Sequence, residues 1–271
     1  MNNHKIAIII LTYSRIENLK ISIKNFYKDS NQNIDLIIQL DKDSDSNTYR
    51  DLFVLKNKYN FKLIATGGVG HDLSYKIAFM SYEHCDFKWI LNDSIILENS
   101  YIDIISNNLN LNFDCFFITN KQIYFNELPI WYATRTGWVI YKNKSIDRNF
   151  IKNNCFNNFP QLMFYNSRNL KFKTICLKLK VNKTTPSYWI NNFWETWFED
   201  FINALNKLGF SKNEIIEICV EHSRNNYFFS FISMLKWPSN FIYNFKENYK
   251  NYMSLNQVVA FKIFRFFSKK L

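Results

Sequence analysis

Short apolar runs alternate with helix-patterned segments through the first hundred residues, and this alternation restricts the fold more than any other feature. The runs are continuous and rich in β-branched residues, as expected of strands buried on both faces of a parallel sheet. Between them, apolar residues repeat at three- and four-residue steps, the period of an amphipathic helix. The pattern predicts an α/β fold with a mostly parallel sheet and flanking helices. The expected strands lie at residues 5–12, 34–40, 61–65 and 87–91, and the expected helices at residues 16–26, 49–55 and 72–82.

The rhythm loosens after the fourth strand. From residue 187 onward, aromatic and apolar residues recur at helical spacing, and Gly209 suits a helix C-cap. We therefore expect two domains, an α/β domain at residues 1–185 and a helical C-terminal appendage at residues 186–271. Further elements are expected at residues 100–109 (helix), 114–119 and 139–141 (strands), from residue 159 (short helix) and at 173–181 (extended chain).

Two local signals concern the way in which the expected helices begin. Ser14 and Glu17 stand three residues apart before the first helix, in the register of a capping box. Gly67, Gly68 and Gly70 lie between the third strand and the third helix. This loop matches neither the G-x-G-x-x-G nor the G-x-x-x-x-G-K-[ST] motif. Either its backbone requires positive φ angles, or it contacts a ligand through Gly68.

The charge of the chain indicates an anionic partner. A formal net charge of +11 suits nucleic acid, a membrane face or a phosphorylated substrate, and no recognised nucleic-acid motif accompanies it. The five cysteines and four histidines are scattered without the spacing of a disulfide framework or a zinc site, so we expect a reducing cytosol. We find no signal-peptide layout and no apolar run of about 18 residues, so neither export by that route nor a membrane-spanning helix is expected.

The segment at residues 258–271 is both basic and aromatic. Lys262, Arg265 and Lys269 fall on one helical stripe, next to phenylalanine and isoleucine side chains. The pattern is typical of a helix in a membrane interface, and equally of a terminal helix docked on its domain with a solvated basic edge. In the first interpretation, the protein is cytoplasmic and peripheral on the inner face of an anionic membrane.

Polar residues follow three of the expected strands: Thr12 and Tyr13 the first, Asp41 the second, and Asn92 and Asp93 the fourth. Because the C-terminal ends of parallel strands meet at the edge where ligands bind, we expect these side chains to converge. There, an aromatic ring can flank a base, and a carboxylate can accept a base N–H or a ribose hydroxyl. A carboxylate-bound cation can neutralise a diphosphate. Taken singly, each is also an ordinary turn residue.

In this order, the motifs resemble the nucleotide-sugar-binding half of family 2 glycosyltransferases of the GT-A fold. The resemblance rests on I-I-I-L-T-Y-S-R, an acidic second strand end, G-G-V-G before a helix, and W-I-L-N-D-S. T-G-W-V-I-Y, F-P-Q and the tryptophan-rich C-terminal helices are most similar to abequosyltransferase-like bacterial enzymes of surface-polysaccharide synthesis. The likeness covers most of residues 5–210. It implies an enzyme that moves a sugar from a nucleotide diphosphate to a saccharide or lipid-linked glycan acceptor.

The resemblance also implies a cofactor and site residues. Members commonly read L-D-D-D where residues 91–94 of this chain read L-N-D-S, so a single carboxylate remains for Mn²⁺ or Mg²⁺. The implied metal affinity is weaker, and a metal-independent enzyme stays open. The implied donor-binding residues are Thr12, Tyr13, Arg15 (on phosphate), Asp41, Gly68, Asn92 and Asp93, with Asp93 also the metal ligand. The aromatic residues that could stack on an acceptor sugar, or pack in the core, are Trp131, Tyr132 and Trp138.

The catalytic base is the second departure from the family. Inverting members use an acidic residue in the acceptor half, but no acidic residue falls between positions 148 and 190. The only Glu-Asp pair, Glu199-Asp200, lies in the expected C-terminal helices. We favour Glu127 over Asp147 and Glu195, because it precedes the aromatic acceptor-like stretch.

The sequence thus predicts a glycosyltransferase of hexosyltransferase type that acts in bacterial surface glycan synthesis, such as lipopolysaccharide or capsule. Two alternatives stay open. The motif at residues 91–94, which keeps only one carboxylate, also fits a non-catalytic nucleotide-sugar or glycan-binding protein of the same fold. A nucleotidyltransferase would carry a Gly- and Arg/Lys-rich loop after the first strand, which residues 12–15 do not supply.

Overall fold

The computed structural model describes most of the chain up to residue 182 and a short part beyond it. The chain divides into two compact units, one of residues 1–129 and 133–186, the other of residues 130–132 and 187–271. The main sheet lies in the first unit. The described residues are 4–28, 33–120, 129–130, 132–134, 136–167, 169–182, 200–215 and 217–218.

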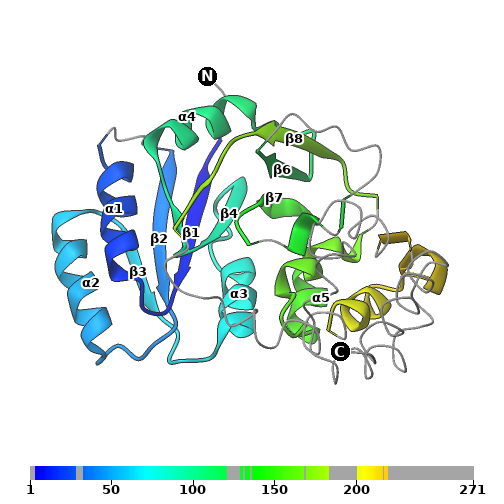
Figure 1. Cartoon of the computed structure of the whole chain (residues 1–271), viewed down its shortest axis with the longest axis horizontal. Coiled ribbons are helices and arrows are strands. Elements are labelled where there is room, and N and C mark those ends of the chain that lie inside the picture. Colours follow the sequence, from blue (N-terminus) through cyan, green and yellow to red (C-terminus); the bar gives the residue numbers. More distant parts are fainter. Residues whose placement is uncertain are drawn as a thin grey trace, which may run out of the picture. The chain divides into compact units, whose positions relative to one another are not determined.

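Within the described residues, seven strands form one sheet in the order β3-β2-β1-β4-β7-β6-β8 (Figure 1). Strand β7 runs antiparallel to both of its neighbours, and every other pair in the sheet is parallel. The mostly parallel α/β architecture predicted from the sequence is confirmed. The strands are β1 (Ile6–Thr12), β2 (Ile34–Leu40), β3 (Lys62–Ala65), β4 (Phe87–Asn92), β6 (Cys115–Thr119), β7 (Val139–Lys142) and β8 (Phe172–Cys176), and a separate pair joins β5 (Ile95–Ile96) to β9 (Lys180–Val181).

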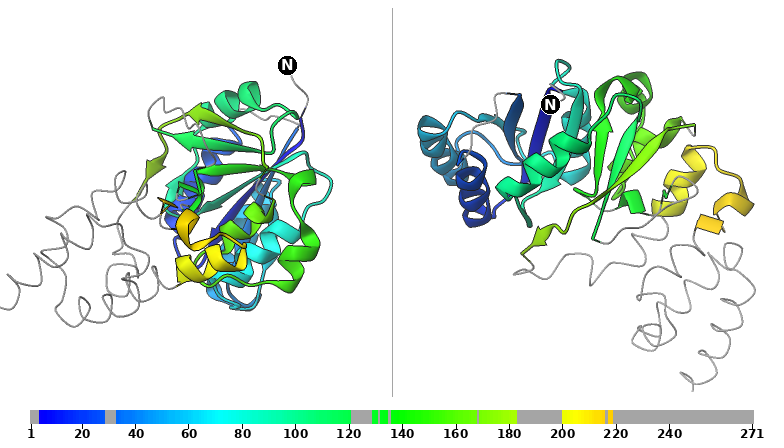
Figure 2. Two further views of the ribbon diagram at one scale, coloured as in Figure 1. Left: turned by 90° about the vertical axis from the view of Figure 1, so that its right-hand side faces the viewer. Right: turned by 90° about the horizontal axis from the view of Figure 1, so that it is seen from above.

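Helices cover both faces of the sheet (Figures 1 and 2). All seven residues of β1 are buried, because successive side chains of a strand point to opposite faces and each face has its own core. On one face, Ile8 belongs to a buried cluster with Ile23 of α1 and Ile102 of α4. On the other, the Gln39 side-chain amide donates to the Ser74 backbone oxygen of α3 at 2.6 Å. The helices are α1 (Ile16–Phe26), α2 (Asn47–Lys58), α3 (His71–Met80), α4 (Asn99–Asn108) and α5 (Arg148–Asn153), with short 3₁₀ turns η1 (Tyr132–Thr134), η2 (Asn143–Ser145) and η3 (Pro160–Asn166).

Beyond the sheet, the described residues include a helix at 200–207, and Gly209 follows it with a φ of 73°, as a C-cap requires. The rest of the expected C-terminal helices, and the segment at residues 258–271, lie outside the described residues. Across the described part of the chain, every helix falls short of the length and apolar character needed to cross a membrane.

The predicted capping box at the start of α1 is wrong. The N-cap is Arg15, one residue later than expected, and no side chain caps the helix. The chain bends after β1, and the Ser14 backbone oxygen accepts from the Ile16 N–H at 3.0 Å. Glu17 pairs instead with the Lys20 amine at 2.6 Å. The start of α1 is therefore set by the turn that leaves β1.

The strand order places a topological switch point at β1. From β1 the chain moves outward to β2 and β3, then returns to the other side of β1 as β4. The connection that leaves β1 leads to β2 on one side, and the connection that leaves β4 leads to β6 on the other. The two diverge at the C-terminal ends of these parallel strands, which is where ligands bind in open α/β sheets. Leu11 pairs with Asn92 across the two strands, so Thr12 and Asp93 follow at the same level.

Candidate functional site

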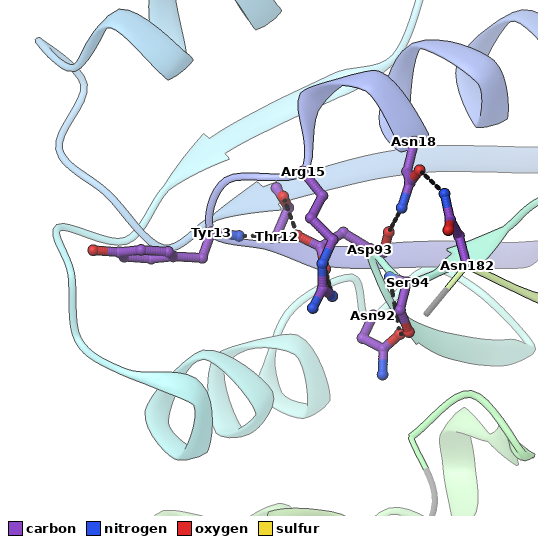
Figure 3. Close-up of polar contacts among 8 residues, drawn as sticks. All are labelled: Thr12, Tyr13, Arg15, Asn18, Asn92, Asp93, Ser94 and Asn182. Carbon is purple, nitrogen blue, oxygen red and sulfur yellow. Dashed lines mark hydrogen bonds and ion pairs between the residues drawn. The ribbon is translucent and has the colours of Figure 1, made fainter. Parts of the chain in front are cut away.

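The carboxylate of Asp93 is the centre of a hydrogen-bonded group at this switch point (Figure 3). Its Oδ2 accepts from the Thr12 hydroxyl at 2.8 Å and from the Tyr13 N–H at 3.3 Å. Its Oδ1 accepts from Nη1 of Arg15 at 2.7 Å in an ion pair. Asp93 is only 7% exposed. The ends of β1 and β4 therefore converge, as expected of parallel strands.

The main chain around Asp93 is held as firmly as its side chain. The Asp93 N–H donates to the Leu11 oxygen at 3.1 Å, and the Asp93 oxygen accepts from the Asn18 amide at 2.9 Å. Asn92 bends back on the turn, and its Oδ1 accepts from the N–H and the hydroxyl of Ser94. The Asn92 carbonyl group thus shapes the turn, which leaves its amide nitrogen as the group that can reach a ligand.

Sequence reasoning missed Asn18 and two neighbours on α1. Asn18, Ser22 and Asn25 lie at i, i+4 and i+7, so they share one side of the helix. The Ser22 hydroxyl accepts from the Leu97 N–H and the Asn25 amide donates to the Leu97 oxygen, both at 3.0 Å. Together they hold the segment from Asp93 to Leu97. The available signal was a row of small polar residues at helical spacing next to the apolar row.

Asn182 was also missed, and it ties a distant segment to the same turn. Its amide donates to Oδ1 of Asn18 at 3.0 Å, and its N–H donates to the Ser94 oxygen at 2.8 Å. Asn182 directly follows β9, which pairs with β5. No local pattern indicates this contact, since 164 residues separate the two asparagines.

The side chain of Asp41, just after β2, holds the glycine loop of residues 67–70 through hydrogen bonds. Its Oδ1 accepts from the Thr66 hydroxyl at 3.0 Å and from the Gly70 N–H at 3.2 Å. Gly67, Gly68 and Gly70 all have positive φ angles, 74°, 70° and 86°, so the conformational interpretation of this loop is confirmed. A Cβ at Gly68 would meet no atom within 4 Å, so the loop is open there. Contact between Gly68 and a ligand stays a prediction.

The Tyr13 ring points away from Asp93 and is 61% exposed (Figure 3). The Lys42 amine lies 4.7 Å from the centre of the ring, close enough for a cation–π contact. Lys42 follows Asp41 at the end of β2, and the sequence had not indicated a role for it. The exposed Tyr13 ring and the Lys42 ammonium thus lie side by side near the C-terminal ends of β1 and β2.

Two of the expected acceptor residues, Tyr132 and Trp138, belong to the described part of the chain. Tyr132 is buried, at 4% exposed, and Trp138 is partly buried against the core. Trp131, and the bases Glu127 and Glu195, lie outside the described residues. Asp147 caps α5, because its Oδ1 accepts from the Phe150 N–H at 2.9 Å and its Oδ2 from the Asn166 amide at 3.0 Å.

The donor set around Asp93 does not fit a divalent cation in this arrangement. Both carboxylate oxygens already accept hydrogen bonds, and the Arg15 guanidinium already balances their charge. Neighbours Asn92 and Ser94 are uncharged and bond to each other. Among the described residues, no three His, Cys, Asp or Glu side chains group as metal ligands would. Mg²⁺ is often held by one or two carboxylates together with substrate phosphates and water, and here the one carboxylate is already engaged by donors at both oxygens.

Comparison with solved structures identifies the fold as GT-A-like, the type found in glycosyltransferases. S. aureus TarS 1–349 in complex with UDP-GlcNAc is similar at 14% identity and a TM-score of 0.60, over 91% of this chain and 81% of that one. The mannosyltransferase PcManGT from Pyrobaculum calidifontis, in complex with GDP-Man and Mn²⁺, is similar at 8% identity and a TM-score of 0.52, over 98% and 88% of the two chains. At such identities the likeness shows the fold alone. No family model and no curated protein matches the sequence.

Proposed function

We propose that this protein is a glycosyltransferase that takes a sugar from a nucleotide-diphosphate donor and transfers it to a saccharide acceptor. One observation carries the proposal. Thr12, Tyr13, Arg15 and Asp93 were selected from the sequence as donor-binding residues, and they converge at the switch point of a GT-A-like sheet. Similar folds hold UDP-GlcNAc and GDP-Man in the two solved structures described above.

The residues at the switch point suit the parts of such a donor. The exposed Tyr13 ring offers a face to the base, and Asp41, at the next strand end, accepts from the base or the ribose. The amide nitrogen of Asn92 donates to a ribose hydroxyl. Arg15 offers guanidinium N–H groups to phosphate oxygens, which it matches in geometry and charge.

The acceptor side of the proposal rests on sequence. Glu127 would deprotonate the attacking hydroxyl, and Trp131, Tyr132 and Trp138 would stack on acceptor sugar rings. The acceptor would be a saccharide or lipid-linked glycan of a bacterial surface, the function of the abequosyltransferase-like enzymes that the motifs resemble. The use of Mn²⁺ or Mg²⁺ remains a prediction from the same resemblance.

Thermal unfolding with UDP, GDP, CDP and dTDP, each with EDTA or Mn²⁺, tests the proposal. A ligand that binds only the folded state raises the melting temperature by mass action. We expect one nucleoside diphosphate to stabilise the protein well beyond the other three. Stabilisation by none of them, under either condition, would contradict a nucleotide-sugar site.

Binding alone does not separate an enzyme from a binding protein that shares its fold. Incubation with the sugar nucleotide of the base that binds, followed by detection of released nucleoside diphosphate, makes that distinction. Release of nucleoside diphosphate identifies a transferase. Without an acceptor the release comes from slow hydrolysis of the donor, and with an acceptor it comes from sugar transfer. Tight binding with no release under any condition favours the non-catalytic alternative. Release of pyrophosphate from a nucleoside triphosphate would instead favour a nucleotidyltransferase.

A further inference from the structure

We propose that Arg15, held in place by Asp93, supplies the positive charge that binds the donor diphosphate, in the role that a divalent cation would otherwise have. The inference rests on the proposed function and deepens it. It assigns Asp93 to positioning Arg15 and assigns diphosphate binding to the guanidinium. The evidence is the disagreement between the donor set at Asp93 and the requirements of a metal ion.

The first argument is the occupancy of the Asp93 carboxylate. Thr12 and Tyr13 donate to one oxygen and Arg15 donates to the other, so three of its roughly four acceptor sites are taken and a metal ion bound through both oxygens would displace at least one of these bonds. Such an ion would compete with the Arg15 guanidinium at 2.7 Å, and with the buried Thr12 hydroxyl or the Tyr13 N–H. Charge-assisted bonds of this kind are about twice as strong as neutral ones.

The second argument is the order of burial in the ion pair. The Asp93 side chain is 9% exposed, whereas that of Arg15 is 32% exposed. The carboxylate is therefore the buried member of the pair and the guanidinium the one that solvent reaches. Two further donors, from Thr12 and Tyr13, offset part of the carboxylate charge from within. An incoming anion meets the guanidinium first.

The third argument is that positions beside Asp93 carry no further negative charge. Asn92 and Ser94 flank it, and both are uncharged and hydrogen-bonded to each other. With one carboxylate and one guanidinium, the group is neutral overall before a ligand arrives. A diphosphate would therefore meet an oriented guanidinium without the repulsion that a cluster of carboxylates would exert.

Pre-organisation explains why Asp93 is needed. A long arginine side chain loses conformational freedom when it binds an anion, and this loss weakens binding. Asp93 holds one end of the fork before the ligand arrives, while Asn18 and Leu11 hold the Asp93 main chain. The plane of the guanidinium is thereby oriented before a ligand arrives. Asp93 is thus a positioning residue in this proposal.

The test is isothermal titration of the nucleoside, monophosphate and diphosphate of the base selected by the thermal panel, in EDTA and in Mn²⁺. We expect wild type to bind the diphosphate in EDTA, with less than about a twofold change on addition of Mn²⁺. Arg15→Gln should weaken diphosphate binding about tenfold to a hundredfold, the range of a hydrogen bond to a charged group. Its affinity for the nucleoside should change less than about twofold.

Two variants sharpen the result. Lys24→Gln removes the same charge from the exposed last turn of α1, and it should bind like wild type. Asp93→Asn removes the carboxylate that orients the guanidinium but leaves the guanidinium itself, so in EDTA it should bind the diphosphate more weakly than wild type but more tightly than Arg15→Gln. Mn²⁺ binding by electron paramagnetic resonance, with and without diphosphate, should be equally weak in wild type and Asp93→Asn.

Diphosphate binding that needs Mn²⁺ in wild type would overturn the inference and leave the proposed function intact. This arm uses no variant, so it holds even if Arg15→Gln does not fold. Unchanged diphosphate affinity in a folded Arg15→Gln would overturn it equally. Absence of nucleotide binding in every condition would instead remove the proposed function, and the inference with it.

Discussion

Thr12 contributes to the site through one hydroxyl, and that hydroxyl can be removed with almost no change in shape. Thr12→Val leaves Oδ2 of Asp93 with only the longer bond from the Tyr13 N–H. Because Thr12 is buried, water does not replace the missing donor easily. Hydrogen bonds to charged groups contribute roughly 1.5–3 kcal/mol, so we expect the free energy of unfolding to fall by about that amount.

Denaturant unfolding of Thr12→Val and Thr12→Ser measures this effect. Serine keeps the hydroxyl and loses only a methyl group, so its loss should be about 1 kcal/mol. A valine variant as stable as the serine variant would mean that the hydroxyl does not support the carboxylate. The wild-type slope of unfolding free energy against denaturant should be kept in both.

At the residue scale, the sequence predicted which side chains meet but not what they do to each other. Thr12, Tyr13 and Asp93 were placed together because parallel strand ends must share an edge. Arg15 was assigned to phosphate and Asp93 to metal as separate roles. Their ion pair depends on the turn that starts α1 at Ile16, which the capping-box pattern placed one residue too early.

At the scale of elements, the C-terminal end of α3 is capped by the buried side-chain amine of Lys88. Lys88 of β4 is fully buried, and its ammonium donates to the backbone oxygens of Phe79 at 2.6 Å, Ala78 and Ser81. These are the carbonyl groups that the last turn of a helix leaves without partners, and a cation suits them. Burial nevertheless lowers the pKa of Lys88 from 10.5 to about 8. The two effects oppose each other at one nitrogen.

The lowered pKa predicts a pH dependence of stability. Between about pH 8 and 10.5, the unfolded chain keeps the Lys88 proton while the folded protein releases it. The unfolded state binds more protons in this window, so the Lys88 contribution to the free energy of unfolding rises with pH. The full rise would be about 3 kcal/mol. Below pH 8 both states are protonated and this contribution is constant.

Lys88→Met provides the reference for this measurement. Burial raises the pKa of Cys115 in both proteins, which lowers stability as pH rises. Burial also raises the pKa of Cys85, and the Lys88 charge partly opposes that rise, so Lys88→Met loses more stability through Cys85 as pH rises and the effect has the same sign. The difference in unfolding free energy between wild type and Lys88→Met, measured from pH 7 to 9.5, should therefore increase with pH. A constant difference would show that the three carbonyl groups keep the amine protonated throughout.

The elements could be predicted where apolar runs and helix-patterned segments alternate along the sequence. They could not be predicted where long-range contacts define them. The three strand–helix repeats that precede β4, and β4 itself, follow from periodicity alone. Strands β5 and β9 have two residues each, too short to carry a period, and pairing across the chain defines them. Gly137 marks another such contact, since its φ is 86° and a Cβ would overlap the Ile95 side chain. Only the folded chain shows why that glycine is required.

For the molecule as a whole, strand order determines where a ligand can bind. The sequence indicated that β1, β2 and β4 were parallel and buried, but not that β1 lies between β2 and β4. Strand β7 enters antiparallel beside β4, and no local pattern indicates its direction. The switch point follows from this order. The candidate site residues could be selected before the strand order was known, because ligand-binding residues follow strand C-termini in either order.

The whole-molecule charge leads to the last prediction, which rests on sequence because residues 258–271 lie outside the described residues. This segment contributes Lys262, Arg265, Lys269 and Lys270 to the net charge of +11, together with four phenylalanines. Each basic residue near an anionic membrane contributes about 1 kcal/mol of attraction. We propose that the segment binds such a membrane, where a lipid-linked acceptor would reside.

Co-sedimentation with vesicles of phosphatidylcholine and phosphatidylserine measures this binding. Removal of residues 258–271 should weaken it at least tenfold, because attraction and apolar burial are lost together. Replacement of Lys262, Arg265 and Lys269 by glutamine should weaken binding to anionic vesicles only, and 0.5 M NaCl should reproduce that loss in wild type. If the shortened chain binds as well as the full chain, the remaining basic surface holds the membrane. The terminal segment would then be a helix docked on its own domain, the alternative that its charge pattern equally allows.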